Sequence, residues 1–343
     1  MKKIITTLAV CAGLVSAVHA QDPNFSQFFA SPITLNPALT GKFDGSFRVA
    51  GNFRNQWPTI NNAFETKTAS FDMGIMKNRI PEFDQFGIGI LGFTDRAGGG
   101  VLTNNYLGLS VAYHKALDED GFHQLGVGFQ GVYSQKRLNP GLVVFEDELT
   151  ANGFVAGTTK EVFLNDRLNL SYFDLNAGVF YSGSTNGYNN FYLGASMYHI
   201  TRPEESHIQE LPADVKFYIN PRVTIQAGGK IPLGNHNYLH LAANHSMQAK
   251  AHNTVVGGAF SYNINNNEDD PVNIYLGGWY RLKDAMIPYI ALEFKGLQIG
   301  TSYDVNTSSL KPASNSRGGM EVSLIYIKKP SDPNARKLNC PRF

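Results

Sequence analysis

Three scarcities limit what this 343-residue chain can be. It has two cysteines, and Cys11 lies in a segment expected to be cleaved, so only Cys340 is left and no internal disulfide can form. After the N-terminus, no apolar run approaches the ~20 residues that a membrane-spanning helix needs. Positive and negative residues nearly cancel, with a formal net charge of +1, and no block of like charge occurs. This balance argues against nucleic acid or an acidic polymer as a partner.

The first 20 residues have the pattern of a secretory signal peptide. Lys2 and Lys3 precede an apolar run from Ile4 to about Val18, and Val18-His19-Ala20 stands before Gln21. A lipoprotein signal ending at Cys11 is the weaker alternative, because Val10 stands where a small residue is required. An exported chain without a spanning helix is either a periplasmic protein or an outer-membrane barrel.

Alternation with a period of two runs from about residue 46 to 328 and favours the barrel. Between 107 and 114, Leu, Leu, Val and Tyr alternate with Gly, Ser, Ala and His, and 171–182 and 297–306 have similar patterns. One face of such a strand suits hydrocarbon and the other suits water. We therefore predict an all-β fold, a transmembrane antiparallel outer-membrane β-barrel of about 14 strands in contact with outer-membrane lipid. The expected strands are 45–57, 64–76, 85–95, 103–115, 121–134, 171–182, 189–200, 216–230, 237–249, 253–264, 271–282, 286–295, 297–306 and 318–328.

The expected organisation has four parts: a signal peptide (1–20), a periplasmic N-terminal segment (21–44), the barrel (45–328) and a periplasmic C-terminal tail (329–343). An even strand count places both chain ends on the periplasmic side, with short turns there and long loops outside. Segment 21–44 is expected at the periplasmic rim or tucked into the lumen. The tail is expected either to dock a partner, to form an ordered plug, or to be a loose end.

Short motifs near both ends of the chain carry a family resemblance. The N-terminal part holds QDPNFSQF at 21–28, NPALTG at 36–41 and RNQW at 54–57. The C-terminal third holds YR at 280–281, DAMIP at 284–288, YDVN at 303–306, GGMEVSL at 318–324 and CPRF at 340–343. In order and spacing these resemble the PorP/SprF family, membrane proteins of the Bacteroidetes type IX secretion and gliding system. The match extends over nearly the whole mature chain.

The resemblance implies a function without catalysis. Family membership implies a partner protein for export or surface attachment of specific large substrates, such as gliding adhesins, through their C-terminal sorting domains. The expected partners are type IX secretion components and a large secreted or surface protein. The alternative is a channel or transporter for small hydrophobic or sugar-like solutes, as in other barrels of this size.

The candidate contact residues lie in these motifs or on the inner faces of strands. Arg48 and Arg54 fall on the inward face of the first strand, where a charge must be hydrated or paired. Glu293, Asp304 and Glu321 are possible partners, and the arginines either brace the barrel or contact a bound protein segment. Trp57 is expected at the outer membrane interface. The remaining candidates are Asn36, Pro37, Gln56, Asp284, Tyr303, Asn306, Arg342 and Phe343.

Catalytic and metal-binding patterns are weak in this sequence. His236 and His240 would share a strand face while His245 points away, and no cysteine or carboxylate completes a metal site. No Gly-x-Ser-x-Gly elbow occurs, and Gly98-Gly99-Gly100 opens no expected helix. We therefore expect no enzyme activity, no metal and no cofactor.

Overall fold

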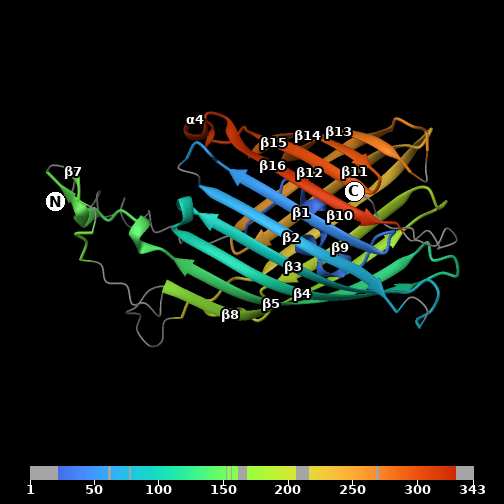
Figure 1. Ribbon diagram of the computed structural model, residues 1–343, viewed down its shortest axis with the longest axis horizontal. Helices are drawn as coiled ribbons and strands as arrows, with labels where there is room; N and C mark the ends of the chain where they lie inside the picture. Colours follow the sequence, from blue (N-terminus) through green and yellow to red (C-terminus); the bar gives the residue numbers. More distant parts are fainter. Residues whose placement is uncertain are drawn as a thin grey trace, which may run out of the picture.

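Fourteen antiparallel strands close into a barrel in the computed structural model (Figure 1), which describes residues 22–60, 63–76, 79–151, 153–155, 157–160, 168–205, 216–267 and 270–329. The ring closes because β1 pairs with both β2 and β16. The predicted number of strands is confirmed. The barrel strands are β1 (Phe47–Gln56), β2 (Phe64–Ile75), β3 (Gln85–Ala97), β4 (Leu102–Ala116), β5 (Gln124–Leu138), β8 (Asn169–Gly183), β9 (Asn190–Tyr198), β10 (Arg222–Gly234), β11 (Asn237–Gln248), β12 (Ala251–Asn263), β13 (Val272–Arg281), β14 (Ala285–Phe294), β15 (Leu297–Asn306) and β16 (Arg317–Lys328).

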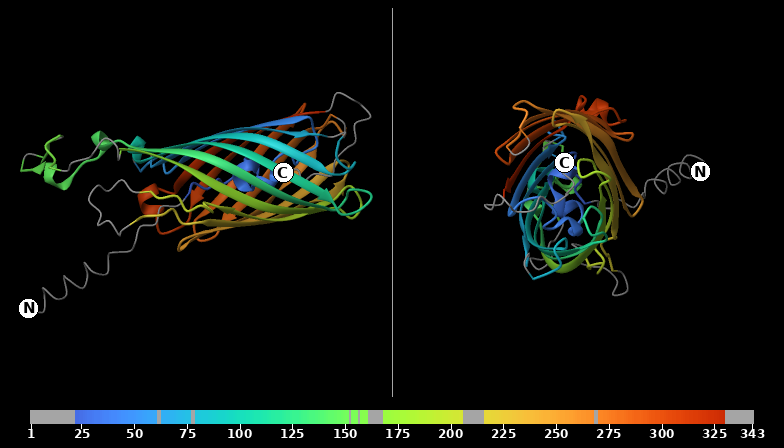
Figure 2. Two further views of the ribbon diagram at one scale, coloured as in Figure 1. Left: turned by 90° about the horizontal axis from the view of Figure 1, so that it is seen from below. Right: turned by 90° about the vertical axis from the view of Figure 1, so that its right-hand side faces the viewer.

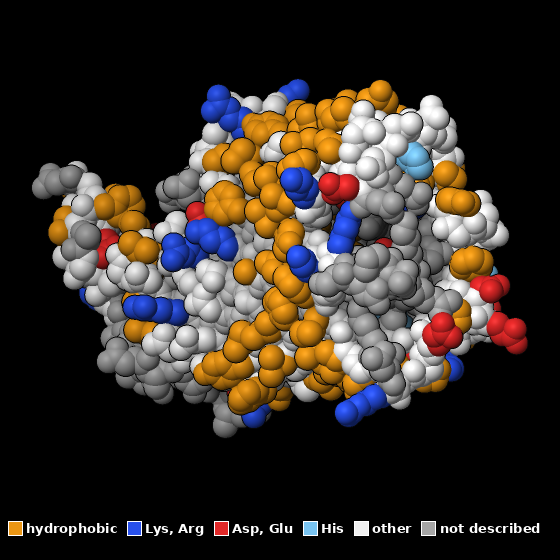
Figure 3. Space-filling view, turned by 45° about the vertical axis from the view of Figure 1, so that its right-hand side comes forward, with side chains coloured by type: hydrophobic (Ala, Val, Ile, Leu, Met, Phe, Trp, Pro, Cys, Tyr) orange, Lys and Arg blue, Asp and Glu red, His pale blue; other side chains and the backbone are white. Residues whose placement is uncertain are grey.

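Side chains along the strands alternate between an apolar outer face and a mostly polar inner face. In β4, Leu109 is 63% exposed and its neighbour Ser110 is 2% exposed; in β5, Phe129 and Gln130 differ in the same way. Hydrophobic side chains cover a broad part of the outer surface (Figure 3). The predicted alternation is confirmed, and it suits a wall between lipid and a filled lumen. In the described part of the chain, no helix is long and apolar enough to cross a membrane.

The longest connections gather at one end of the barrel, as the strand parity predicts. Short connections such as 117–123, 184–189 and 295–296 lie at one end, here called the turn end. The opposite end, here called the loop end, is where β5 connects to β8 and β9 connects to β10. A small hairpin in the β5–β8 connection projects from the loop end (Figure 1) and was not predicted. The elements within the connections are η3 (Gly98–Gly100), η4 (Pro140–Leu142), η5 (Glu146–Glu148), β6 (Leu149–Thr150), β7 (Gly153–Phe154) and α4 (Lys311–Ser314).

Residues 22–44, here called the lumen segment, pass through the inside of the barrel (Figure 2). They contain three short helices, η1 (Phe28–Ala30), α2 (Pro32–Leu35) and η2 (Pro37–Leu39). Most of their side chains are buried against the inner wall. Of the two expected placements, the rim and the lumen, the structure has the second.

The two ends of the described chain lie at opposite ends of the barrel. The Asp22 backbone N–H donates to Gln248 at the loop end of β11, 2.8 Å away, whereas Lys328 ends β16 at the turn end. This differs from the expectation that both chain ends lie on one side. An even number of strands places the start of β1 and the end of β16 at the same end of the barrel. Residues 22–44 cross the lumen before β1, so the chain begins at the opposite end. The expected tail from 330 to 343 lies outside the described residues.

Candidate functional site

Two arginines and two carboxylates form a buried group on the inner wall, here called the inner ion cluster. Arg54 of β1 binds Asp304 of β15 at 2.9 Å and lies 3.8 Å from Glu321 of β16. Arg281 of β13 binds the same Asp304 carboxylate at 2.8 Å. None of the four residues is more than 7% exposed. Buried charges are tolerated only when paired and hydrogen-bonded, and here two cations offset two anions.

The inner ion cluster binds the lumen segment partly through hydrogen bonds to the backbone of the segment. Glu321 accepts hydrogen bonds from the backbone N–H groups of Ser26 and Gln27, at 2.7 and 2.9 Å. The Ser26 hydroxyl donates to Asp304 at 2.7 Å and accepts from Arg281 at 2.6 Å. Hydrogen bonds to charged groups are stronger than neutral ones, so this contact holds the start of η1 firmly.

A second ion pair holds the lumen segment nearer the turn end. Arg48 makes a bidentate contact with Asp72 of β2, at 3.0 and 2.7 Å. The same guanidinium donates to the Leu39 carbonyl at 3.0 Å, and Asp72 accepts from the Gly41 backbone N–H at 2.7 Å. The arginines were expected either to brace the wall or to contact a bound segment. Here they do both, and the segment belongs to the same chain.

Aromatic side chains anchor the middle of the lumen segment. Phe28 and Phe29 lie 5.5 and 5.3 Å from the ring of Trp279, and Phe29 lies 5.4 Å from Tyr289. All four are at most 6% exposed. Each buried aromatic side chain contributes about 1.5–3 kcal/mol through the hydrophobic effect, so this cluster supports the polar contacts.

The Asn-Pro motif of the sequence fixes the lumen segment to the opposite wall. The Asn36 side chain donates to the carbonyls of Val179 in β8 and Ala195 in β9, at 3.0 and 3.3 Å. Its Oδ1 atom accepts from the Ala38 backbone N–H at 2.9 Å and caps η2, which begins at Pro37. Asn36 is thus followed by a short helix, and the side chain that caps this helix also bonds the wall.

A histidine between two carboxylates ties the start of the lumen segment to the loop end. His199, just after β9, contacts Asp174 through Nδ1 and Asp22 through Nε2, the latter at 2.9 Å. Arg222 lies 3.4 Å from Asp22. Burial disfavours the charged imidazole and lowers its pKa, but the contacts with Asp22 and Asp174 together have the larger effect. They raise the pKa of His199 to about 9. Burial likewise opposes the charge on Asp22, yet His199 and Arg222 hold the pKa of that carboxyl below its usual range.

The raised pKa of His199 makes the anchoring of Asp22 dependent on pH. A histidine with a folded pKa above its ordinary 6.5 contributes stability that is full below pH 6.5 and is lost as the pH rises through 9. We expect the free energy of local opening of residues 22–25 to fall by up to about 3 kcal/mol between about pH 6 and pH 10. Hydrogen exchange of the backbone amides of Asp22, Asn24 and Phe25, compared at each pH with that of His199→Gln, measures how much His199 contributes to this free energy. His236→Gln at the turn end is the control, and an unchanged difference across this range would contradict the prediction.

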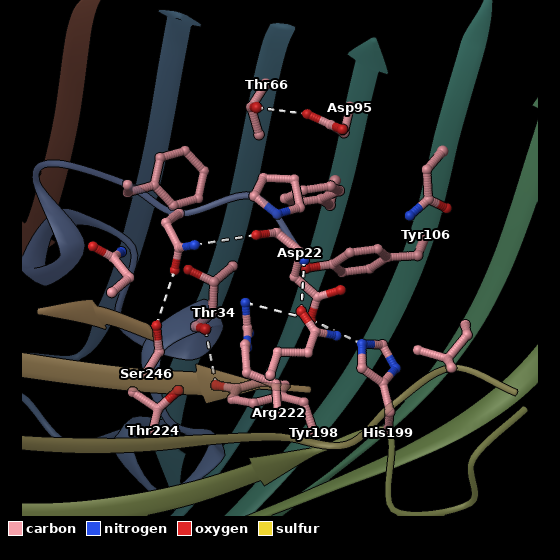
Figure 4. Close-up of a pocket in the computed structure, with 18 of the residues that line it drawn as sticks. Asp22, Thr34, Thr66, Asp95, Tyr106, Tyr198, His199, Arg222, Thr224 and Ser246 are labelled. Atoms are coloured by element: carbon pink, nitrogen blue, oxygen red, sulfur yellow. Dashed lines mark hydrogen bonds and ion pairs between the residues drawn. The ribbon is translucent and has the colours of Figure 1, made fainter. Parts of the chain in front are cut away.

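A cavity of about 1030 Å³ lies at the loop end of the lumen, beside the start of the lumen segment (Figure 4). Phe25, Phe28 and Leu35 of the segment line one side of it. Aromatic side chains of the wall, including Tyr106 and Tyr198, face the same space as charged groups (Figure 4). The mixture suits a ligand with both apolar and charged parts.

The structure brings most of the predicted contact residues together around the lumen segment and the cavity. Gln56 and Trp57 line the cavity, as does Asp284, which pairs with Arg281 at 3.1 Å. The Asn306 amide is 1% exposed and lies beside Asp284. That Trp57 also lies at the headgroup level of the outer membrane stays a prediction.

Four of the predicted contact residues lie elsewhere or beyond the described chain. Glu293 accepts hydrogen bonds from Tyr275 at 2.6 Å and from Asn273 at 2.8 Å. Its expected role as a partner of a lumenal arginine stays a prediction. Tyr303 is 40% exposed on the outer face and does not face the lumen. Arg342 and Phe343 lie outside the described residues. Among those described, no group of three His, Cys, Asp or Glu side chains could hold a metal ion.

Comparison with known proteins identifies a family and a fold. A family model described as type IX secretion system membrane protein PorP/SprF matches residues 17–326. No curated protein matches the sequence. The solved Pseudomonas putida toluene transporter TodX has a TM-score of 0.52 at 8% identity, over 90% of this chain and 98% of that chain. The Ralstonia pickettii toluene transporter TbuX has a TM-score of 0.48 at 10% identity, over 88% and 93% of the two chains. At such identities the likeness to TodX concerns the fold alone.

Proposed function

We infer, because the chain belongs to the PorP/SprF family of type IX secretion system membrane proteins, that it is a partner for particular exported proteins. In this proposal the barrel lies in the outer membrane and takes part in exporting or attaching specific large substrates through their C-terminal sorting domains. It performs no catalysis. Its partners are components of the secretion system and one large secreted or surface protein.

The observation that carries the proposal is how the inner wall binds polypeptide. Carboxylates of the wall accept backbone N–H groups of the lumen segment, Glu321 at one level and Asp72 at another. Aromatic side chains hold the same segment between these levels. Backbone hydrogen bonds with aromatic anchors are the means by which proteins recognise extended segments of other proteins. The wall is thus built to hold a polypeptide, and its cavity at the loop end offers room for more of one.

The proposal places the loop end outside the cell and the turn end in the periplasm. Long loops of outer-membrane barrels are extracellular and short turns periplasmic, and this assignment opens the cavity outward. The signal peptide would be removed after Ala20, and the tail from 329 would remain in the periplasm. Substrate and cavity would then meet at the cell surface.

Co-purification from the native outer membrane tests the proposed partner role. We expect the tagged full-length protein, extracted in a gentle detergent, to recover one large surface protein in near-stoichiometric amount together with secretion components. Mass spectrometry identifies them, and a tagged unrelated barrel of similar abundance serves as the control.

The competing function is a channel for small hydrophobic or sugar-like solutes. The lumen segment occupies the interior between the cavity and the turn end, which argues against an open path through the described structure. Recovery of the barrel alone, with solute flux after reconstitution into vesicles, would overturn the partner role and favour the channel.

A further inference from the structure

Almost every charged side chain that lines the cavity has an oppositely charged partner in the described structure. Lys136 pairs with Glu205, and Asp284 pairs with Arg281. Asp95 of β3 differs, because no described cation lies within 4.0 Å of its carboxylate. The further pairs are Arg222 with Asp22, His199 with Asp22 and Asp174, and Arg54 with Asp304.

The surroundings of Asp95 suit a positively charged group. Thr66 donates its hydroxyl to one carboxylate oxygen of Asp95 at 2.6 Å, which orients the group toward the cavity (Figure 4). On the same part of the wall, the rings of Phe93 and Tyr106 stack at 4.3 Å. A cation gains from a nearby carboxylate and also from an aromatic face.

The opposite wall of the cavity adds acceptors that have no partner. Asn244 is 6% exposed, and its Oδ1 atom has no hydrogen bond within the described structure. The Oδ1 atom of Asn253, on the next strand, is unpaired in the same way. Both residues line the cavity. A ligand that satisfies these groups and Asp95 together must carry donors at several points, as a polypeptide does and a single small cation does not.

We propose that this cavity binds a lysine- or arginine-bearing segment of the exported partner, with its cationic side chain on Asp95 beside Tyr106. The inference rests on the proposed function and names the chemistry that the partner must present. The segment enters from the loop end. Its cation makes the direct ion pair that Asp95 lacks, since Lys136 and Arg54 act on that carboxylate only from beyond 4.0 Å. Its backbone N–H groups reach the opposite wall.

A pair of peptides that differ only in charge tests the inference on the purified full-length protein in detergent. The probes are acetyl-Gly-Gly-Arg-Gly-Gly-amide and the same peptide with neutral citrulline in place of arginine. We expect the arginine peptide to bind about tenfold more tightly by calorimetry at low salt, and we expect Asp95→Asn to abolish that difference. Tyr106→Leu keeps the carboxylate and lowers the affinity of the arginine peptide about threefold.

Glu119→Gln, an exposed change at the turn end, is the matched control and leaves both affinities unchanged. Equal binding of the two peptides, or an undiminished difference in Asp95→Asn, would overturn the inference. Binding of free arginine as tight as that of the peptide would assign the site to a small solute amine and overturn the polypeptide part. If Asp95→Asn recovers the partner at the normal yield, the inference about Asp95 is wrong while the proposed partner role stands. Failure of the unchanged protein to recover any partner refutes the proposed function.

Discussion

Replacing Glu321 with alanine is expected to release the lumen segment while the barrel stays closed. Glu321 accepts the backbone N–H groups of Ser26 and Gln27 and also the Asn52 amide, at 2.9 Å. Its loss leaves these donors without their acceptor, and leaves Arg54 with Asp304 as its remaining carboxylate, which it shares with Arg281. Removing one member of a buried ionic group costs about 3–5 kcal/mol. If the lumen segment leaves the barrel, its donors bond water and the cost is relieved. The wall stays in place because strand pairing keeps it closed.

Limited proteolysis with mass spectrometry measures the release. We expect cleavage between residues 25 and 40 in Glu321→Ala but not in the unchanged protein, together with a larger conductance in planar bilayers. Heat-dependent mobility in detergent gels verifies that the barrel is intact. The control is Glu65→Ala in β2, because Glu65 forms a surface pair with Lys67 that contributes little to stability. A segment that stays protected in Glu321→Ala would contradict the prediction and mean that the remaining contacts, the aromatic cluster among them, are enough to retain it.

The barrel could be predicted from sequence because its signal is local. Each strand must show lipid one face and the lumen the other, so each of the fourteen strands carries its own period of two. The same alternation predicted that three charged residues face the lumen and can pair there, namely Arg54, Asp304 and Glu321. Asp72 has an inward position in β2 and could have been named on the same ground.

The path of the lumen segment could not be predicted from any local pattern. Ser26, Gln27 and Asn36 bond strands that lie far away in sequence, and η1 and α2 are too short to give a helical period. The contact between Asp22 and His199 depends on the whole route of the chain through the barrel. Arg281 stood within a recognised motif, but the motif did not show that it would meet Asp304.

Close approach between wall and segment gives a second, purely steric prediction. Gly128 of β5 faces the lumen, and a Cβ atom built there would lie 2.5 Å from the Cα atom of Ala38. The obstacle is backbone and not a flexible side chain, so η2 (Pro37–Leu39) must move as a unit. Overpacking of this kind costs about 1–3 kcal/mol, and more where the neighbour cannot yield. We therefore expect Gly128→Val to push η2 off the wall and to break the Asn36 contacts with β8 and β9.

Gly131 provides a control in the same strand, because it lies on the outer face with no atom within 4 Å of a Cβ built there. Gly131→Val adds the same side chain to the same sheet, toward lipid, and is expected to change little. Protease protection of residues 25–40 and bilayer conductance measure both variants as for Glu321→Ala. Gly128→Val and Glu321→Ala disturb the segment at different levels, one by volume and one by charge. If both expose the whole segment, it leaves the lumen as one cooperative unit; if each exposes only its own level, the two levels hold independently.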